Sequence, residues 1–362
     1  MKVESIEAYP IRIKAKERLQ GGTFSYSYYQ TVLVKATCEG TEGWGEAMTR
    51  FEPAATDAMV RSLGGVLRGS DLGSVADFWS AMWRELRIRG HTRGVGVEAL
   101  SGIEMALYDC RGKMEGTPVG GLFVKRPTGR VKVFAGSLFR SRARIRTQVE
   151  AAKARGMLGA KVKTGFGVET DSEILAEARR AWPDGLIVAD ANGAYDGKTA
   201  AKACRAFREL DLAWFEEPVL SDDLAGYAML KGLGVKIGAG ESWFVNDFEK
   251  PMADGLVQVL EPSVSRCGGI GVEMGVAKQA SESHLGFSPM TGMNSAISLA
   301  ASLHVASAYP TIAVEFNPFP NPLQTDLIDD LPQPSNGSVR VPTRPGLGVE
   351  VDVRYVKAHT SK

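Results

Sequence analysis

A repeat of strand and helix patterns runs through the last two thirds of the chain and leaves few folds open. From about residue 131, short apolar runs rich in β-branched residues alternate with amphipathic stretches of helical period, a pattern typical of parallel strands joined by helices. Eight such runs are present: KVFAGS, AKVKTG, LIVADA, LAWFEEP, KIGAGES, VQVLEP, GFSPM and IAVEF.

The residues that close these runs recur at steps of 24 to 27 positions: Lys163, Asp190, Glu216, Glu241, Arg266, Met290 and Glu315. Each step has room for one strand and one helix. Eight units of nearly constant length predict an α/β fold in the form of a closed (β/α) barrel. A doubly wound open sheet is the alternative, but no Gly-x-Gly-x-x-Gly turn follows any of the runs.

The chain of 362 residues is too long for one simple core. Its start predicts an antiparallel meander: a strand, a Gly- and Tyr-rich loop over 21–29, a second strand and the turn EGTEGWG. Helical periodicity follows up to about residue 114. We therefore expect an α+β capping domain over 1–125, a catalytic barrel over 126–330, and a C-terminal segment, 331–362, that returns to the capping domain.

Composition excludes several classes of protein. Lys and Arg number 43 and Asp and Glu 42, a net charge of +1 that favours neither nucleic acid nor an anionic membrane as partner. No apolar run approaches the ~18–20 residues that span a bilayer, and the first residues lack a signal-peptide pattern. The cysteines form no C-x-x-C pair, which indicates reduced thiols and a cytoplasmic location: Cys38, Cys110, Cys204 and Cys267.

Three carboxylates end successive strands of the expected barrel: Asp190, Glu216 and Glu241. Strand ends converge on one mouth of a barrel, where three such groups repel one another unless a cation neutralises them. Oxygen ligands favour Mg²⁺, with Mn²⁺ next, and the lack of His or Cys argues against zinc. Each acid alone could be a helix N-cap, but three at one period favour a metal site. Asn192 and Glu217 are expected to order the water ligands of the metal or a lysine.

The run AKVKTG supplies a second signal. Residues two apart in a strand share a face, so Lys161 and Lys163 point the same way. Helices cover the outside of a barrel strand, which makes the inside the expected direction. A lysine beside a metal and another cation is expected to have a lowered pKa and to act as a base.

With these motifs in order, the chain resembles the enolase superfamily, in the branch of mandelate racemase and muconate lactonizing enzyme. The matching stretches are ALSGIEMALYDCRGK, AKVKTG, VADANG, WFEEP, GAGES, RCGGI, VEFNPFPNPL and RPGLGVEVD. They cover nearly the whole chain. The resemblance implies an α+β capping domain, a modified (β/α)₇β barrel, Mg²⁺, and removal of the proton α to a carboxylate, with the enediolate held on the metal. It also implies a homo-oligomer, a dimer or an octamer.

Residue roles follow from the same resemblance. It makes Asp190, Glu216 and Glu241 the metal ligands and Lys163 the base. It also places Lys161 and Glu315 at the carboxylate of the substrate, where the lysine neutralises its charge.

The chain departs from the family pattern on the wall opposite the lysines. Many relatives carry a carboxylate and a histidine there, where this chain has Ser263 and Met290. His284 is expected to be structural. Muconate-lactonizing relatives use a lysine at the position of Arg266, and arginine does not deprotonate at neutral pH. Arg266 is expected to bind a substrate oxygen or to stabilise a leaving group, so only one face of the substrate has a base.

Two N-terminal segments are expected to close over the mouth, one with Phe24, Tyr26, Tyr28 and Tyr29 and the other with Met48, Arg50 and Phe51. The alternative places the aromatic residues in the core of the capping domain. The expected substrate-binding set is Tyr26, Tyr28, Arg50, Met290 and Asn294. Part aromatic and part polar, such a pocket suits a sugar acid or a cyclic acid.

The expected function is that of a Mg²⁺-dependent lyase or isomerase acting on a small-molecule carboxylate. Removal of the α-proton would lead to β-elimination, a dehydration, or to cycloisomerisation of a sugar acid or its lactone. A racemase or epimerase of a carboxylic acid or amino-acid derivative is a second possibility. A catalytically silent metal-binding relative is the third, although binding alone needs no buried base.

Overall fold

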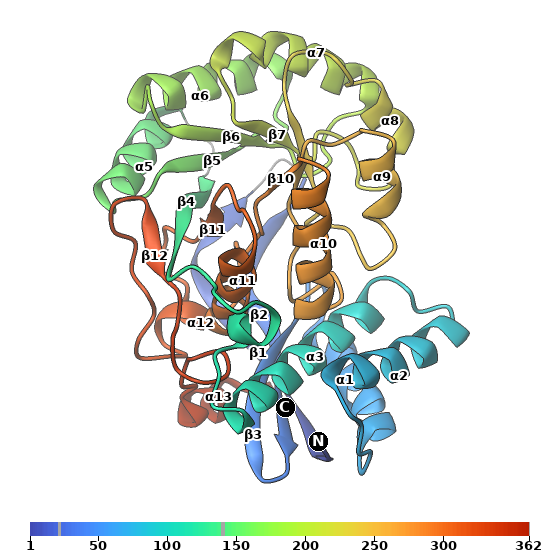
Figure 1. The fold of residues 1–362 in the computed structure, drawn as a ribbon. Helices are drawn as coiled ribbons and strands as arrows, with labels where there is room; N and C mark the ends of the chain where they lie inside the picture. The colour runs from blue at the N-terminus through green and yellow to red at the C-terminus, as the bar shows by residue number, and fades with distance from the viewer. Residues whose placement is uncertain (21–22, 139–141, 362) are drawn as a thin grey trace.

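The computed structural model describes residues 1–20, 23–138 and 142–361. Three antiparallel strands open the chain: β1 (Val3–Gln20), β2 (Ser25–Cys38) and β3 (Thr41–Met48). Four helices follow: α1 (Pro53–Leu67), α2 (Val75–Ile88), α3 (Val95–Met114) and α4 (Val119–Phe123). Helix α3 is buried along most of its length and packs on β3, where Gly43 and Gly45 leave its backbone room to approach. These elements form the α+β layer, blue to teal in Figure 1.

The expected loop over 21–29 is shorter in the structure. Residues 25–29 already belong to β2, with Tyr26 opposite Leu19 and Tyr28 opposite Lys14. Alternating Ser and Tyr in SYSYY is a strand pattern, and tyrosine favours strands, so the prediction of a loop there was wrong. Gly21 and Gly22, the start of that loop, lie outside the described residues. The result is a long hairpin that reaches over the barrel (Figure 1).

Eight strands follow the eight apolar runs, each in the expected place: β4 (Arg130–Leu138), β5 (Gly159–Lys163), β6 (Leu186–Asp190), β7 (Trp214–Glu216), β8 (Ile237–Ala239), β9 (Val259–Leu260), β10 (Gly286–Phe287) and β11 (Val314–Phe316). They are parallel and neighbour one another in chain order, with β11 beside β4. The helices between them are α5 (Arg142–Ala154), α6 (Val168–Ala181), α7 (Gly197–Phe207) with the 3₁₀ turn η1 (Arg208–Leu210), α8 (Leu224–Ala228), α9 (Glu249–Ala253), α10 (Ile270–Glu282) and α11 (Ala296–Ala308).

Backbone hydrogen bonds also join the last two strands of this series. The Ile312 amide donates to the Phe287 carbonyl at 2.9 Å, and the Glu315 amide donates to the Pro289 carbonyl at 3.2 Å. Strand order without a reversal excludes the doubly wound sheet, in which order reverses at a switch point. The prediction of a (β/α)₇β barrel is therefore confirmed.

The inside of the barrel is built in two layers. The lower layer is an apolar floor to which five strands or their edges each contribute one inward residue: Phe134, Val188, Trp214, Val259 and Ala313. The rings of Phe134 and Trp214 pack edge to face. Two residues further along, the same face of the strand carries a polar group. Val188 is followed by Asp190, Trp214 by Glu216 and Ala313 by Glu315. Strand alternation thus lifts the polar side chains above the floor, toward the mouth.

Two inward positions carry glycine because neighbouring acids need the space. A Cβ on Gly136 in β4 would lie 2.0 Å from Glu315 Oε1, and one on Gly238 in β8 would lie 2.4 Å from Glu261 Oε2. Such distances are far below contact, so any larger residue would displace a carboxylate.

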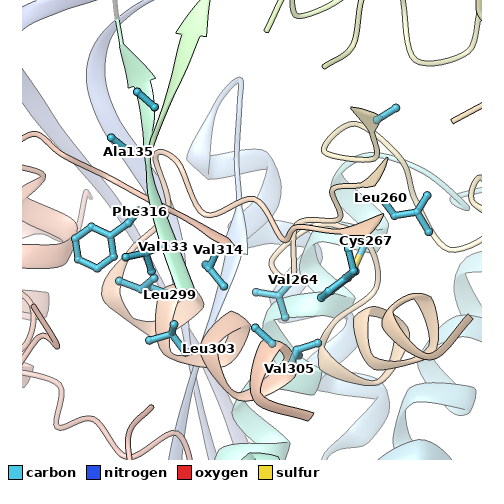
Figure 2. Close-up of a cluster of buried hydrophobic side chains, with 14 of the residues drawn as sticks. Val133, Ala135, Leu260, Val264, Cys267, Leu299, Leu303, Val305, Val314 and Phe316 are labelled. Carbon is cyan, nitrogen blue, oxygen red and sulfur yellow. The ribbon is translucent and has the colours of Figure 1, made fainter. Parts of the chain in front are cut away.

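Apolar side chains pack against the outer faces of β4 and β11, the first and last strands of the barrel. Val133 and Val314 point outward from β4 and β11, and Leu299 and Leu303 of α11 lie against them (Figure 2). All of these side chains are fully buried. Because α11 is buried on every side from Ala296 to Ser307, it forms part of the core instead of the surface.

The last part of the chain contacts both layers. It contains α12 (Pro322–Thr325), β12 (Ser338–Arg340), which pairs with β4, and α13 (Val353–His359), which lies beside β1. Buried Asp109 of α3 connects it to the capping layer. Its carboxylate accepts hydrogen bonds from the amides of Trp44 and Leu347, each at 2.8 Å, and pairs with Lys113.

Replacing Asp109 with alanine should lower the free energy of unfolding by about 3 kcal/mol, because two buried amides and an ammonium group lose their acceptor. Urea unfolding would measure it, and limited proteolysis should show earlier cleavage in the C-terminal segment. Asp352→Ala is the control. It removes the cap of α13, which has two amide donors near the surface, and should cost about 1 kcal/mol. Equal stability of the two variants would contradict this prediction.

Within the described residues, no helix combines the length and the apolar character needed to cross a membrane. All four cysteines are buried free thiols, as expected.

Candidate active site

A cavity at the mouth of the barrel gathers side chains from both layers. The capping layer contributes Phe24, Tyr26, Tyr28, Gln30, Thr31, Glu46, Met48, Thr49 and Arg50. The barrel contributes Lys161, Lys163, Asn192, Glu241, Met290, Gly292, Met293, Asn294 and Glu315. The cavity therefore lies at the carboxyl ends of the strands, where barrel active sites are found.

Lys161 lies at the centre of the carboxylates. Its Nζ is 2.9 Å from Glu216 Oε1, 3.3 Å from Glu315 Oε2 and 3.5 Å from Asp190 Oδ2. Burial lowers the pKa of Lys161, but the carboxylates around it raise the pKa more, and the net value is well above the usual range. Lys161 is therefore a fixed positive charge and not a base.

Lys163 points into the same cavity from two residues further along β5. Its Nζ donates to Asp190 Oδ2 and, at 2.9 Å, to Asn192 Oδ1, and it lies 5.3 Å from the centre of the Phe24 ring. Burial and Lys161 lower the pKa of Lys163, but Asp190 raises it above its usual value. The pKa of Lys163 is thus raised while it pairs with Asp190. The expected lowering depends on a cation at the strand-end carboxylates and stays a prediction.

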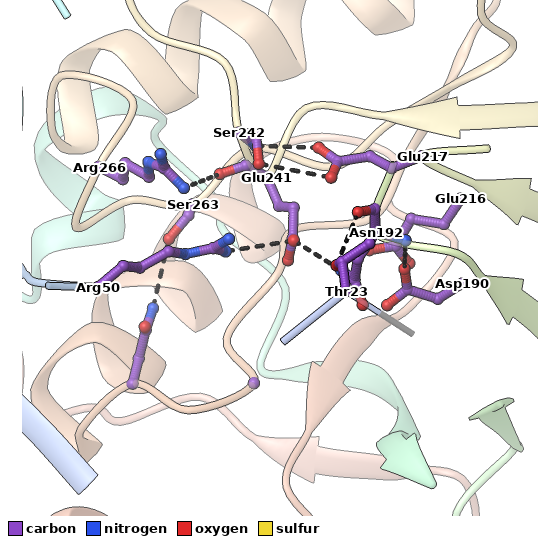
Figure 3. Close-up of polar contacts among 12 residues, drawn as sticks. Thr23, Arg50, Asp190, Asn192, Glu216, Glu217, Glu241, Ser242, Ser263 and Arg266 are labelled. Carbon is purple, nitrogen blue, oxygen red and sulfur yellow. Dashed lines mark hydrogen bonds and ion pairs between the residues drawn. The ribbon is translucent and has the colours of Figure 1, made fainter. Parts of the chain in front are cut away.

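Glu241 follows β8, and its carboxylate contacts one residue of the capping layer and one of the barrel. Arg50 Nη2 of the capping layer lies 3.2 Å from Glu241 Oε1, and Asn192 Nδ2 donates to the same oxygen at 3.0 Å (Figure 3). Burial opposes ionisation, but Arg50 and the two lysines hold the pKa of Glu241 at about 2. Glu241 is therefore ionised at neutral pH.

Asn192 and Glu217 share an unusual backbone conformation. Their φ angles are 47° and 36°, in the left-handed region that non-glycine residues seldom adopt. Glu217 accepts hydrogen bonds from the Ser242 amide at 3.1 Å and its hydroxyl at 3.4 Å (Figure 3). Burial and the charge of Glu241 raise the pKa of Glu217 to about 8. Both residues orient the strand ends that carry the carboxylates.

Glu216 has an unexpected neighbour below it, Glu261 after β9. Trp214 Nε1 donates to Glu261 Oε1 at 2.9 Å, while the Oε2 atoms of Glu216 and Glu261 have no hydrogen-bond donor among the described residues. Burial raises the pKa of each carboxyl well above its usual range, and the charge of Asp190 adds to the effect at Glu216.

The fit of a divalent cation can be judged from these contacts. Asp190 and Glu216 are paired neighbours on β6 and β7, and Glu241 follows the next strand. Among the described residues, no three acidic, histidine or cysteine side chains are grouped closely enough to hold a metal as they stand. Each carboxylate pairs instead with Lys161, Lys163 or Arg50. The donors are all oxygens and Glu216 keeps a buried oxygen without a donor, so the set suits a hard cation that would take over these pairings.

Arg266 is not among the residues that line the cavity. Its Nε lies 3.4 Å from Glu98 Oε1 of α3, and its guanidinium carbon lies 4.9 Å from the centre of the Phe244 ring. Nη1 reaches the Glu241 carbonyl at 3.5 Å (Figure 3). Arg266 thus connects the two layers behind a carboxylate of the site.

The wall opposite the lysines is built from residues 290–294. Met290 is buried, and Asn294 Nδ2 donates to Ser265 Oγ at 3.1 Å and to Ser263 Oγ at 3.4 Å. Ser263 is fully buried behind that amide. His284 is exposed just past α10, away from this wall.

The aromatic residues expected at the mouth divide into two groups. Phe24, Tyr26 and Tyr28 line the cavity, and the first two rings pack with centres 4.8 Å apart. Tyr29 alternates to the other face of β2, where its hydroxyl donates to the Pro320 carbonyl. Phe51 is 91% exposed, so it does not close over the site.

Two acids of the site, Glu46 and Glu261, carry no obvious functional signal in the sequence. Glu46 sits in TEGWGEAM, which has only a strand pattern, and Glu261 comes 20 residues after Glu241, off the period of the other strand ends. The usable signal was alternation, because Glu261 lies two residues after Val259 of the floor, as Glu216 does after Trp214.

The fold is a (β/α)₇β barrel with an α+β cap, and it carries paired inward lysines and three carboxylates on adjacent strands. This combination defines a barrel enzyme of the lyase or isomerase type. Comparison with known proteins agrees. The model of the mandelate racemase / muconate lactonizing enzyme N-terminal domain matches residues 12–123, and the enolase C-terminal domain-like model matches 144–356. The chain belongs to this branch of the enolase superfamily.

Individual relatives are dehydratases, cycloisomerases and racemases. D-galactarolactone cycloisomerase of Agrobacterium fabrum is 28% identical over 97% of both chains. D-galactonate dehydratase of Xanthomonas axonopodis pv. citri is 27% identical over 89% of this chain and 88% of its own. The crystal structure of a racemase from Streptomyces coelicolor A3(2) with bound magnesium is 26% identical, covers 99% of this chain and 100% of its own, and superposes with a TM-score of 0.91.

Proposed function

We propose that this enzyme removes the proton α to the carboxylate of a sugar acid or its lactone and drives β-elimination, a dehydration, or cycloisomerisation. The observation that carries the proposal is a pair of inward lysines that line one cavity with Glu241 and form ion pairs with the other two strand-end carboxylates, Glu216 and Asp190. The similarity to a galactarolactone cycloisomerase and a galactonate dehydratase supports a sugar-acid substrate.

Asp190, Glu216 and Glu241 would hold a divalent cation, which we propose to be Mg²⁺, with Mn²⁺ as a substitute. When bound, the cation supplies electrostatic stabilisation of the charge that develops on the substrate carboxylate. Asn192 would keep its contact with Glu241, and Glu217 its contact with the Ser242 amide. The magnesium in the Streptomyces relative supports this choice of metal.

The two lysines have different tasks in this proposal. Lys161, fixed between carboxylates, attracts the negatively charged end of the substrate and stabilises added charge there. Lys163 Nζ accepts the α-proton. To do so it must first lose its own proton, which becomes easier once Asp190 is neutralised by a cation, because burial and Lys161 already lower the pKa of Lys163.

The group that leaves the β-carbon decides the type of reaction. After the α-proton goes to Lys163, the electron pair of the α C–H bond forms a double bond to the β-carbon, and the β C–O bond breaks. If that oxygen is a hydroxyl, it takes up the proton held by Lys163 and leaves as water, so the reaction is a dehydration. If it is a ring oxygen, the ring opens, the proton held by Lys163 returns to the opened product, and that product is an isomer. In both cases the enol gives a 2-keto acid by proton exchange with water.

The opposite wall supports chemistry on one face only. Met290, Met293 and Asn294 carry no group that exchanges a proton near neutral pH. Glu315 pairs with Lys161, and Glu46 accepts hydrogen bonds from Thr31 and Ser295, so both carboxylates are already engaged. This arrangement favours elimination over racemisation, which needs acid–base groups on both faces.

Incubation of the enzyme with Mg²⁺ and a panel of sugar acids and lactones in D₂O tests this function. We expect deuterium at the α-carbon of only one epimer, and a product that is either dehydrated or isomeric by mass. Proton NMR and mass spectrometry measure both. Equilibration of the two epimers of any substrate would instead favour the racemase alternative. The similarity to a racemase from Streptomyces coelicolor is the reason to test for it.

We also propose an assembly and a location for the enzyme. The family resemblance supports a homo-oligomer, a dimer or an octamer, and the four reduced thiols support a cytoplasmic location. Arg266 is proposed to act on the reaction through Glu241 and Arg50, since it contacts the former and not the cavity.

A further inference from the structure

We infer that Glu46, a capping-layer residue, is a positioning residue for the reaction. It acts by holding the cavity wall opposite the lysines. Glu46 is only 1% exposed and lies in β3. It belongs to neither the metal ligands nor the lysine pair, and no part of the proposed chemistry uses its carboxylate.

The hydrogen bonds of Glu46 join the two layers. Its Oε2 accepts from the Ser295 hydroxyl at 2.7 Å, and the Ser295 amide lies 2.9 Å from both carboxylate oxygens. Thr31 of β2 donates to Oε1 at 2.8 Å. Ser295 is the N-cap of α11, so a negative charge rests at the positive end of a helix of 13 residues. Ser295 is fully buried, so its amide and hydroxyl would be left unsatisfied if they lost this acceptor.

The segment before Ser295 is the cavity wall itself. Met290, Gly292, Met293 and Asn294 line the cavity and lead directly into α11. Asn294 is held from behind by Asn321 and Gln324, which donate to its carbonyl at 3.1 and 2.9 Å. On the capping side, the Met48 amide donates to the Ser265 carbonyl at 3.1 Å. Glu46 therefore fixes how far the wall stands from the lysines.

A second acid of the capping layer makes the same kind of contact elsewhere and provides a matched control. Glu104 of α3 accepts from the amides of Ile270 and Gly271, at 2.8 and 2.7 Å, at the start of α10. It too is buried and crosses between the layers, but it is not among the residues that line the cavity. Comparing variants of Glu46 and Glu104 distinguishes an effect on the position of the cavity wall from a general loss of contact between the two layers.

The test compares Glu46→Gln with Glu104→Gln. Glutamine has one accepting oxygen where glutamate has two. Glu46→Gln therefore loses one of the two oxygens that the Ser295 amide contacts, and Glu104→Gln loses the acceptor of one amide at the start of α10. In Glu46→Gln we expect amide hydrogen exchange over residues 290–297 to rise about tenfold. The kcat should fall about 10- to 100-fold, since a small shift of the α-carbon from Lys163 is costly. The KM should change less than about threefold, because Lys161 and the metal ligands are untouched.

Glu104→Gln should raise exchange over residues 268–275 and leave kcat within about twofold of wild type. The inference is overturned if Glu46→Gln keeps its kcat within twofold, if exchange over 290–297 is unchanged, or if both variants lose kcat equally. The kinetic half rests on the proposed function. Exchange is measured without substrate, so an enzyme that turns over no sugar acid or lactone would refute the function while the exchange contrast still decides what Glu46 holds.

Discussion

Replacement of Lys163 with alanine should lower turnover about 10²- to 10⁴-fold, the usual contribution of a general base, and should remove α-proton exchange in D₂O to the same extent. The amine is the group in the cavity that can accept the proton once Asp190 binds a cation. Steady-state kinetics and the rate of deuterium incorporation are the two measurements. Binding of Mg²⁺ should persist, because alanine leaves all three carboxylates in place.

Two further variants separate the base from a simple positive charge. Lys163→Arg keeps a cation beside Asp190 but cannot give up its proton at neutral pH, so it should be as inactive as alanine. Lys132→Ala removes an exposed lysine of β4 and should leave activity unchanged. Near wild-type exchange in Lys163→Ala would show that another group removes the proton.

Loss of the metal should be the second large effect. We expect excess chelator to abolish turnover, and Glu216→Gln to weaken Mg²⁺ binding by more than about 100-fold, because loss of a ligand should exceed the 10- to 100-fold typical of residues behind the ligands. The variant also removes the closest partner of Lys161. Titration calorimetry with Mg²⁺ measures the affinity, and turnover is followed in parallel.

Glu273→Gln is the matched control for that experiment. Glu273 of α10 is also fully buried, and neither carboxylate oxygen has a hydrogen-bond partner among the described residues. It is not among the residues that line the cavity, so its replacement should leave Mg²⁺ affinity and kcat unaltered. Full activity with chelator present, or equal Mg²⁺ affinity in Glu216→Gln and wild type, would refute a metal site at these carboxylates.

Periodicity made most of the barrel predictable. All eight apolar runs became strands, because a strand buried on both faces must be apolar and β-branched whatever surrounds it. The shared direction of Lys161 and Lys163 followed from alternation, and their inward direction followed from the helices expected outside the barrel. These are local properties of a segment, and local properties can be read from one sequence.

Features that depend on contacts between distant segments were harder to predict from the sequence. Arg266 comes 25 residues after Glu241, as a strand-end residue of the barrel would. In the structure it pairs with Glu98 of the capping layer and does not line the cavity. The pKa of Lys163 depends on whether Asp190 or a cation is its nearest neighbour. Glu46 looks like any acid in an edge strand until Ser295, 249 residues away, is brought beside it. No pattern within a segment could reveal these partners.

The two-layer interior has a consequence for how such a barrel changes over evolution. Val188, Trp214 and Ala313 help to fill the floor, while Asp190, Glu216 and Glu315 stand two residues further along the same strands. A new acid or base can therefore replace an old one without opening a void in the hydrophobic centre. Substitutions that change the chemistry can therefore be selected without loss of stability. A designer could likewise exchange the upper ring of side chains while keeping the residues of the floor unchanged.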